Sequence, residues 1–340
     1  MLRQLTCIAG ALAVLLGWPG CGARALELPC SSPAGWELQR QLELPRGAAD
    51  GQRIGGLSAA AFAPPASDRL WLLSDLPQGS LSHWSGLTAA LAGGPPPRFA
   101  GSLALQRQPL DGEGLVQLEG QLWVASEGRR TPTRPAELLR FDARSGRLLQ
   151  SVDVPADWQP GPDRGLDSNA GPESLALGYQ ANGRPFLLMA AERPLLQDPP
   201  RHVRLLRWQW QPGQDHLRLA PTPLPQGALL LPHGDGWGLT DLLVVQPGGR
   251  LLGLLRHFQA PDRWQIRLAL YPLPTPGQAR PAAPLASWDL LAIGLEPDNW
   301  EGLAAGPVLA DGRAVLVLVS DDNLNPFQAN RLAMLSPRCL

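Results

Sequence analysis

The sequence contains no lysine, so all 29 of its basic side chains are arginines. They are balanced by 30 acidic residues, which gives a formal net charge of −1. A chain this close to neutrality lacks the positive charge that DNA, RNA or an anionic membrane attracts, and we expect no nucleic-acid partner. Nucleotide bias in the source genome explains the missing lysine most simply. The alternative is functional, because a planar guanidinium binds oxyanions through two parallel hydrogen bonds.

The chain also offers no apolar run that favours a membrane span. The apolar stretch from Cys7 to Trp18 has 12 residues, whereas a membrane-spanning helix needs about 20. Arg3 precedes the stretch and Ala23-Arg24-Ala25 follows it, which is the pattern of a cleaved signal peptide. We therefore expect residues 1–25 to be removed and residues 26–340 to form one secreted or periplasmic domain without a transmembrane segment.

Cysteine is scarce, with four residues in the whole chain. Cleavage after Ala25 leaves Cys30 and Cys339, near the two ends of the mature chain, and export permits a disulfide between them. We expect that bond to form. Cys21 leaves a lipidated N-terminus open as an alternative, although Trp18-Pro19-Gly20 matches the lipidation pattern poorly.

Several motifs of common hydrolases and nucleotide-binding proteins are missing. The sequence has no G-x-S-x-G turn, no H-E-x-x-H helix, no C-x-x-C pair and no G-x-x-x-x-G-K phosphate loop. No covalent nucleophile is identifiable. A catalytic mechanism, if there is one, must rest on other side chains.

Glycine and proline, by contrast, are abundant, at 37 residues each. They lie between short apolar runs such as Leu70 to Leu73 and Val315 to Val319, where turns belong. No amphipathic helical run of convincing length appears after the signal segment. The pattern predicts a nearly all-β fold in one domain.

A recurrence near 60 residues organises these runs. Each repeat has a short apolar strand, usually preceded by an acid, and a second strand that usually ends in another acid. The repeats start at residues 55, 113, 173, 241 and 301, with spacings of 58, 60, 68 and 60. Such repetition is typical of a β-propeller. We expect five blades, or six if one is degenerate, with the termini sharing the last blade and the segment Trp36 to Pro45 completing it.

The repeat places acids at equivalent points around the predicted central channel. At the first strand these are Glu113, Glu173, Asp241 and Glu301. So many carboxylates cannot all stay ionised together unless a cation lies among them. Ca²⁺, which takes six to eight oxygen ligands, and arginine side chains are the two candidates.

The second strand adds a further set of acids, with one exception. Asp75, Glu127, Glu192 and the pair Asp321-Asp322 are the acids, and Arg256 replaces the acid in the fourth repeat. Other arginines lie nearby in the sequence: Arg53, Arg129, Arg130, Arg134, Arg193 and Arg331. A site with both acids and guanidinium groups is suited to bind a phosphate or carboxylate ester through a bridging metal. The alternative is that these side chains solvate loop ends and form salt bridges between neighbouring blades.

Paired motifs within these repeats resemble the phytase-like esterase family, described as "esterase-like activity of phytase". Ile54 to Ser58 with Leu70 to Asp75, and Glu113-Gly114-Leu115 with Leu122 to Gly128, carry the likeness. It continues through Leu138 to Asp142, Asn169 to Ala176 and Thr240 to Leu255, and is clearest in Asp298 to Ala304 with Ser320 to Asn323. The resemblance covers about residues 53–336.

The resemblance implies an exported β-propeller that hydrolyses esters, including phosphate monoesters, with Ca²⁺ as in propeller phytases. Two departures stand out: Leu255 lies where a glutamate is expected before Arg256, and Ser174 replaces the glycine that follows the acid in two other repeats. The metal ligands we expect are Glu113, Glu173, Asp241, Glu301, Asp75, Glu127 and Asp321.

In this reading, metal-activated water attacks a small phosphate or carboxyl ester. Glu113, Glu173 and Glu301 are the catalytic acids, and Arg53, Arg129 or Arg256 binds the oxyanion. We expect a monomer. The alternative function is a non-catalytic propeller that binds a ligand or a protein on its loop face, which the missing glutamate before Arg256 favours.

Overall fold

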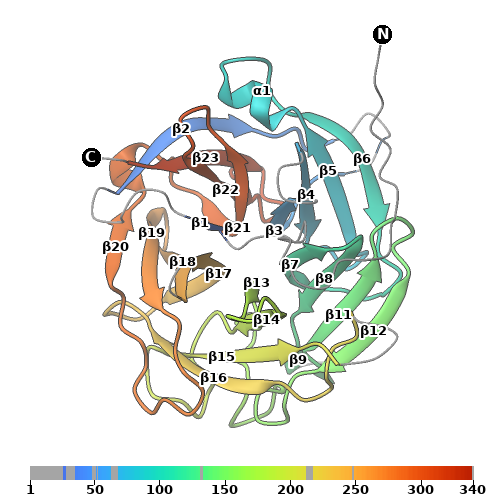
Figure 1. Cartoon of the computed structure of the whole chain (residues 1–340), viewed down its shortest axis with the longest axis vertical. Helices are drawn as coiled ribbons and strands as arrows, with labels where there is room; N and C mark the ends of the chain where they lie inside the picture. The colour runs from blue at the N-terminus through green and yellow to red at the C-terminus, as the bar shows by residue number, and fades with distance from the viewer. Residues whose placement is uncertain are drawn as a thin grey trace, which may run out of the picture.

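Five four-stranded antiparallel units arranged around one axis make up the fold (Figure 1). The computed structural model describes residues 26–27, 35–47, 51, 53–62, 68–130, 133–211, 217–246 and 249–338. In each unit the apolar runs form strands and the glycine- and proline-rich segments form the connections, as strand and turn propensities require. The predicted all-β propeller is therefore confirmed, with five blades.

Each blade is named here in chain order, with its strands from the axis outward. Blade 1 contains β3 (Leu57–Phe62), β4 (Arg69–Ser74), β5 (Ser80–Ser85) and β6 (Arg98–Ala104). Blade 2 contains β7 (Gly112–Leu118), β8 (Gln121–Ser126), β11 (Glu137–Asp142) and β12 (Leu148–Asp153). Blade 3 contains β13 (Ser174–Tyr179), β14 (Pro185–Ala190), β15 (His202–Gln209) and β16 (Leu224–Leu230).

The last two blades involve the N-terminal part of the chain. Blade 4 contains β17 (Trp237–Gln246), β18 (Arg250–Gln259), β19 (Arg263–Pro272) and β20 (Ala286–Asp289), and β1 (Leu26–Glu27) pairs in parallel with the inner side of β17. Blade 5 contains β21 (Asn299–Val308), β22 (Ala314–Asp321), β23 (Arg331–Pro337) and β2 (Trp36–Glu43).

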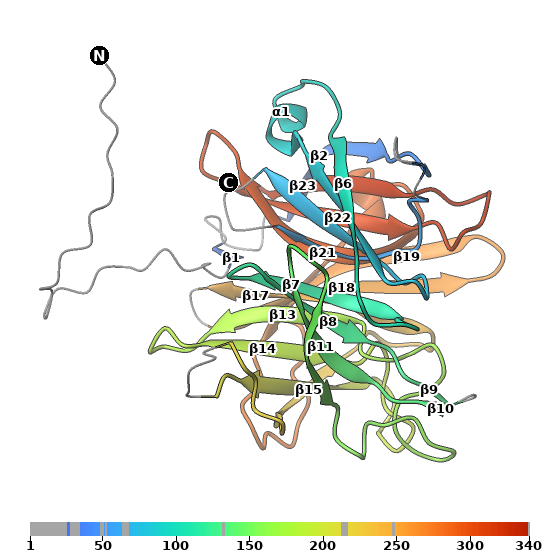
Figure 2. The same cartoon turned by 90° about the vertical axis from the view of Figure 1, so that its right-hand side faces the viewer.

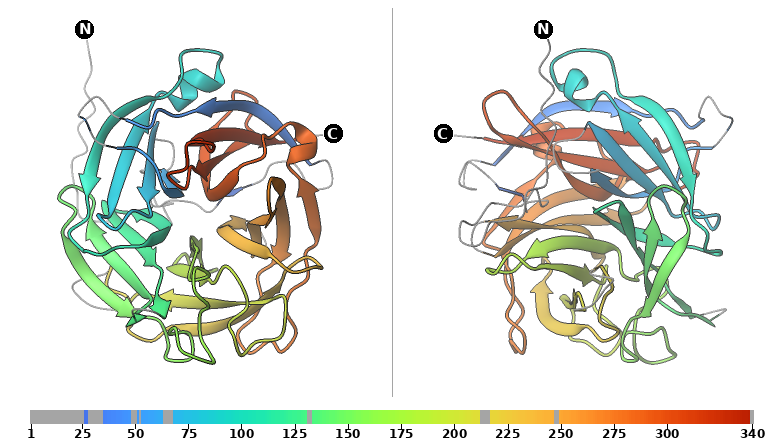
Figure 3. Two further views of the ribbon diagram at one scale, coloured as in Figure 1. Left: turned by 180° about the vertical axis from the view of Figure 1, so that it is seen from behind. Right: turned by 45° about the vertical axis from the view of Figure 1, so that its right-hand side comes forward.

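The ring closes through blade 5, where the two ends of the described chain meet. Strand β2 pairs antiparallel with β23, from Trp36 opposite Pro337 to Glu43 opposite Arg331 (Figure 3). The segment predicted to complete the last blade therefore does so. Cys30 and Cys339 lie outside the described residues, as do Cys21 and residues 1–25, so the disulfide and the signal peptide stay predictions.

Little helix is present in the described part of the chain. Helix α1 (Leu87–Leu91) lies at the outer side of blade 1, and the 3-10 turn η2 (Leu291–Ile293) follows blade 4 (Figure 2). Arg40 of β2 donates a hydrogen bond to the carbonyl of Gly94, 2.9 Å away, and so ties the α1 loop to blade 5. Of the described residues, none forms a helix long and apolar enough to cross a membrane.

The core is divided among the interfaces between adjacent blades. Side chains of a strand alternate between its two faces, so Leu251 packs toward blade 3 while Leu252 packs toward blade 5. Each of the five apolar clusters in the described residues joins one pair of neighbouring blades. The innermost strands β3, β7, β13, β17 and β21 contact one another in sequence around the axis. Their starting ends therefore meet at one mouth of the propeller.

Candidate functional site

A β-bulge near the start of four innermost strands shapes this mouth. The residue without a ladder partner is Ser58 in blade 1, Glu113 in blade 2, Thr240 in blade 4 and Glu301 in blade 5. In blade 3, Glu173 stands directly before β13. A bulge re-aims the unpaired side chain and increases the local twist, which is how an acid on a buried strand comes to face its counterparts.

The strand pairing defines three equivalent positions in each blade, which we call the mouth positions. The second is the bulge residue, or Glu173 in blade 3, and the first lies two residues before it. The third lies opposite the first, at the end of the second strand or just after it in most blades. In chain order the sets are Gly56, Ser58, Asp75; Asp111, Glu113, Glu127; Gly171, Glu173, Glu192; Gly238, Thr240, Arg256; and Asn299, Glu301, Asp321.

Blade 2 has an acid at all three mouth positions. One oxygen from each of Asp111, Glu113 and Glu127 lies within 4.8 Å of the others, and all three residues are buried. Clustered carboxylate oxygens are the ligands that hard divalent cations take. This buried group has the donor chemistry of a cation site.

Two arginines hold Asp111 in this group. The short antiparallel ribbon of β9 (Arg129–Arg130) and β10 (Thr133–Arg134) follows blade 2's second strand. Arg129 Nη2 lies 3.1 Å from Asp111 Oδ2, and Arg134 contacts the same oxygen. The side chain of Arg129 is 54% exposed, so its guanidinium also faces the solvent at the mouth.

Glu113 lies in a different electrostatic environment from Asp111. Burial raises the pKa of Glu113 well above its ordinary value, and Glu173, Glu301, Glu127 and Asp75 raise it further. Burial likewise raises the pKa of Glu173, and among the acids Glu192 raises it most. Carboxyl groups in this situation hold protons or a cation.

Two acids at the third mouth position show the same effect to a smaller degree. Burial raises the pKa of Glu127 to about 7, although the hydrogen bond from the Gly171 amide lowers it by favouring the ionised form. Burial and the charge of Asp321 raise the pKa of Asp75 to about 7. The carboxyl groups of Glu127 and Asp75 therefore titrate near neutral pH when no cation is bound.

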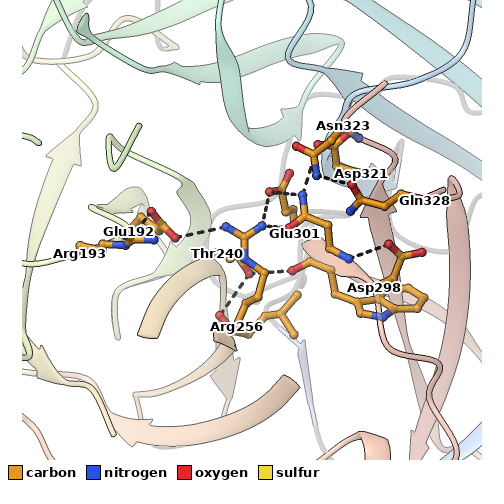
Figure 4. Close-up of polar contacts among 12 residues, drawn as sticks. Glu192, Arg193, Thr240, Arg256, Asp298, Glu301, Asp321, Asn323 and Gln328 are labelled. Atoms are coloured by element: carbon orange, nitrogen blue, oxygen red, sulfur yellow. Dashed lines mark hydrogen bonds and ion pairs between the residues drawn. The ribbon is translucent and has the colours of Figure 1, made fainter. Parts of the chain in front are cut away.

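Arg256 is the one basic residue among the fifteen mouth positions. It belongs to blade 4 and contacts acids of blades 3 and 5. Its Nη1 lies 2.5 Å from Glu301 Oε1 and its Nη2 lies 3.3 Å from Glu192 Oε1 (Figure 4). Burial alone would lower the pKa of Arg256, but Glu301, Glu192 and Glu173 raise it above its ordinary value. With 15% of its side chain exposed, Arg256 is an internal counter-ion to Glu301 and Glu192, and its predicted oxyanion-binding role stays a prediction.

Asn299 completes this half of the mouth. Its side-chain Nδ2 donates to Glu301 Oε1 at 2.9 Å and to Asp321 Oδ2 at 3.3 Å, and its Oδ1 accepts from Arg256. Burial raises the pKa of Glu301 to about 8, although Arg256 opposes the shift. Arg256 and Asn299 thus connect the acids of blades 3 and 5, whereas blade 2 has its own three-acid group.

Asp241 does not occupy the position that the repeat spacing gave it. Thr240 is the residue equivalent to Glu113 and Glu301, and Asp241 is one residue further along β17. Asp241 Oδ1 accepts from the amide of Leu242 and Oδ2 from the amide of Leu303, each at 2.7 Å, which ties blade 4 to blade 5. The predicted alignment of Asp241 with Glu113 and Glu301 is wrong, because the bulge at Thr240 adds one unpaired residue to β17.

Two glycines make room for acids of the preceding blade. A Cβ on Gly171 would lie 2.3 Å from Glu127 Cγ, and one on Gly238 would lie 2.1 Å from Glu192 Oε1. The amide of Gly171 donates to Glu127 Oε1 at 2.6 Å. Glycine at the first mouth position therefore allows the neighbouring carboxylate to pack against the backbone.

The other predicted site residues lie at the same mouth with different environments. Asp321 is buried, and burial raises its pKa to about 6. Asp322 accepts from the amide of Gly56 at 3.1 Å and pairs with Arg46 at 3.4 Å, so it joins blade 5 to blade 1. Arg53 is exposed and forms a backbone bridge with Gly47.

Sequence reasoning did not assign Asp111 or Asn299 to the site. Both occupy the first mouth position, where three blades have glycine, so no repeating acid marks them. The Asp111-Gly112-Glu113 spacing was the available signal, because residues two apart on a strand share a face. It was weakened by the bulge that separates the two acids.

Comparison with solved structures is consistent with this fold. An exo-β-1,3-galactanase from Clostridium thermocellum matches at 11% identity and a TM-score of 0.51, over 86% of this chain and 61% of that chain. An endo-arabinase from Bacteroides thetaiotaomicron matches at 12% identity and a TM-score of 0.48, over 84% and 95%. At such identities the likeness concerns the fold alone. No curated protein matches the chain.

A protein-family match covers most of the propeller. The phytase-like family, described as "Esterase-like activity of phytase", matches residues 52–324. This range includes all fifteen mouth positions and the resemblance noted in the sequence. The chain belongs to the phytase-like family.

Proposed function

We propose that the protein is an exported ester hydrolase that uses a divalent cation at the three-acid group of blade 2. The observation that carries the proposal is the buried convergence of Asp111, Glu113 and Glu127. Membership of a family named for esterase-like activity supports the reaction class. The signal-like N-terminal segment supports the location.

The residues of this group fit a hard cation such as Ca²⁺. They offer oxygen donors only, and the pKa of Glu113 is raised by burial and by four neighbouring acids without a basic residue among the principal causes. A divalent ion would hold these groups ionised, and further oxygens from water or substrate would complete the six to eight ligands of Ca²⁺. Such an ion polarises an ester oxygen and lowers the pKa of water.

Glu173 is suited to carry a proton during the reaction. It lies outside the three-acid group. Burial raises its pKa well above the ordinary value, and Glu192, Glu127 and Glu301 raise it further while Arg256 opposes the shift, which favours the protonated form of the carboxyl group. A protonated carboxyl can donate to the leaving alcohol as a general acid.

Substrate anions would meet exposed guanidinium groups at the mouth. Arg129 is 54% exposed and Arg193 is 47% exposed, although each also contacts an acid. Arginine binds phosphate and carboxylate through two donors at once. We propose these two, rather than the enclosed Arg256, as the groups that bind and orient the ester.

Hydrolysis of generic esters, with and without chelator, tests the proposal. The substrates are p-nitrophenyl phosphate, p-nitrophenyl acetate and inositol hexakisphosphate. We expect one of them to be cleaved, chelation to abolish cleavage, and Glu173→Gln to lower kcat by about 10²- to 10⁴-fold, the range for a lost general acid. Glu37→Gln, a half-exposed acid on β2, is the matched control.

The result that contradicts the proposal is equally specific. If a folded protein cleaves none of these esters with any divalent ion, the enzyme assignment fails and a non-catalytic binding propeller is the better account. If an ester is cleaved at a rate that neither chelator nor Glu173→Gln changes, the protein is an ester hydrolase but the proposed metal and general-acid mechanism is wrong.

A further inference from the structure

A second concave site lies at the opposite end of the propeller from the mouth positions. It is a cavity of about 350 Å³ between blades 2 and 3. Glu119 comes from the β7–β8 turn, Gln180 and Arg184 from the β13–β14 turn, and Gln209 and Trp210 from the end of β15. Because these strands run six to eight residues away from the mouth, the two sites are about 20 Å apart at 3.3 Å per residue.

The cavity has the size and lining of a small-molecule site. Its volume falls within the roughly 300 to 1,000 Å³ of typical ligand pockets. Three glutamines line it, Gln180, Gln209 and Gln211, and each amide offers both donors and an acceptor. Glu119 and Arg184 add one charge of each sign, so these charges cancel and favour an uncharged ligand.

Trp210 gives the cavity a flat apolar wall. Its ring is half-buried and meets the ring of Trp123 edge to face at 5.8 Å between centroids. The indole Nε1 of Trp210 is buried, so Trp210 lines the cavity with ring carbons rather than with its nitrogen.

The residue before Gln180, Tyr179, does not line the cavity. Its hydroxyl is buried without a partner in the described part of the protein. Burial and the nearby charge of Glu119 raise the pKa of Tyr179 to about 12, so the hydroxyl keeps its proton. Neutral donors predominate here, in contrast to the carboxylates at the mouth.

The β7–β8 turn places its acid at the cavity in a strained conformation. Glu119 has a φ of 48° and Gly120 a φ of 76°, which is the left-handed pattern of a two-residue hairpin. Asparagine or glycine would fill the position of Glu119 more easily, since this conformation costs other residues about 1 to 2 kcal/mol. The turn therefore holds Glu119 among the residues that line the cavity.

We propose that this cavity binds a neutral sugar, either a monosaccharide or the end of a glycan. A sugar ring has an apolar face of C–H groups that can lie on Trp210, and a rim of hydroxyl groups that both donate to and accept from amides and Glu119. The opposite charges of Glu119 and Arg184 cancel, so the cavity does not attract an anionic ester electrostatically. The inference does not depend on the proposed hydrolase function.

Titration of the mature wild-type protein with D-glucose, D-galactose, D-xylose and L-arabinose tests this proposal by calorimetry and saturation-transfer NMR. We expect saturable binding of at least one sugar with a Kd of about 1 mM, which corresponds to a binding free energy of roughly −4.1 kcal/mol. Trp210→Ala should weaken it at least about tenfold and Gln180→Ala by several-fold, because they remove the wall and a rim amide.

Two controls separate this site from the rest of the molecule. Trp288→Ala removes a half-buried tryptophan that packs on Trp36 at the blade 4–5 interface, and should leave sugar binding unchanged. Binding should also persist in Glu113→Gln and in the presence of chelator. Gln180 is a half-buried turn residue, so Gln180→Ala keeps the test valid even if Trp210→Ala lowers stability.

Any of three results would overturn the assignment. The first is the absence of saturable binding for all four sugars in folded wild-type protein. The second is sugar binding that is unchanged in both Gln180→Ala and Trp210→Ala. The third is sugar binding that is lost equally in Trp288→Ala.

Discussion

Arg256 Nη1 lies 2.5 Å from Glu301 Oε1, and this buried contact crosses from blade 4 to blade 5. Arg256 stands where the other four blades have an acid at the third mouth position. A guanidinium there neutralises Glu301 and Glu192 together. Among the described residues, the group of three acids that could hold a cation lies in blade 2.

Removing this guanidinium should destabilise the protein strongly. Arg256→Met leaves Glu301 and Glu192 buried without their counter-ion, and we expect a loss of about 3 to 5 kcal/mol in the free energy of unfolding. Chemical denaturation measures it. The double variant Arg256→Met/Glu301→Gln should recover part of the loss, because the two changes are coupled; fully additive losses would show that the pair is not the source.

The pH dependence of stability follows from the raised pKa values at the mouth. In the folded, cation-free protein the pKa of Glu127 is raised from 4.5 to about 7 by burial, so the folded state binds its proton more tightly than the unfolded state does. Stability should therefore be highest below the ordinary pKa and fall as the pH rises toward about 7.

The size of this effect and its reversal by cation can both be measured. One pKa unit corresponds to about 1.4 kcal/mol, so we expect a fall on the order of several kcal/mol in cation-free protein. Excess Ca²⁺ should remove most of that fall, since the ion stabilises the ionised carboxylates. Thermal unfolding in chelator and in Ca²⁺ provides the comparison, and stability that rises with pH in chelator would contradict it.

Gly171 should be sensitive to a single added methyl group. Gly171→Ala places a Cβ 2.3 Å from Glu127 Cγ, which forces Glu127 away from Asp111 and Glu113. We expect Ca²⁺ affinity to fall by about 10- to 100-fold, as for other changes that misorient a metal ligand. Gly47→Ala, where no atom lies within 4 Å of the added Cβ, should bind Ca²⁺ like wild type; equal loss in both variants would count against the assignment.

The repeat in the sequence was sufficient to predict the propeller and the position of most mouth acids. Strand alternation and spacing place Glu113, Glu173 and Glu301 correctly at the starts of innermost strands. The same spacing misplaced Asp241 by one residue because a bulge adds an unpaired residue that periodicity does not reveal. Leu255 pairs with Leu239 and is equivalent to Ser126 and Ser320, so no glutamate is missing there.

Blade 1 shows a second limit of the repeat. Gly55 was aligned with Glu113, whereas Ser58 is the equivalent residue. With a serine at the bulge, no acid marked the phase of this blade. The contacts of Asp111 with Arg129 and Arg134 could not be predicted from the repeat, since both arginines belong to the β9–β10 ribbon.

Export and the disulfide are testable on the secreted protein. We expect a mature N-terminus at Leu26 and a bond between Cys30 and Cys339, which would lock the strand pairing between β2 and β23. Intact-mass measurement with and without reductant checks both. Two thiols that react in the denatured, unreduced protein would remove the disulfide, and a lipidated Cys21 would replace soluble export with membrane anchoring.

The central claim is that Asp111, Glu113 and Glu127 hold a divalent cation, and metal stoichiometry tests it most directly. Purified protein is equilibrated with Ca²⁺, dialysed and assayed for bound metal beside Glu113→Gln and the control Glu37→Gln. We predict about one ion per chain in wild type and in Glu37→Gln, and about 10- to 1,000-fold weaker binding in Glu113→Gln, because the substitution keeps size and removes one anionic ligand. A folded wild-type protein that retains no Ca²⁺ or other divalent ion, or a Glu113→Gln variant that binds it equally well, would contradict the claim.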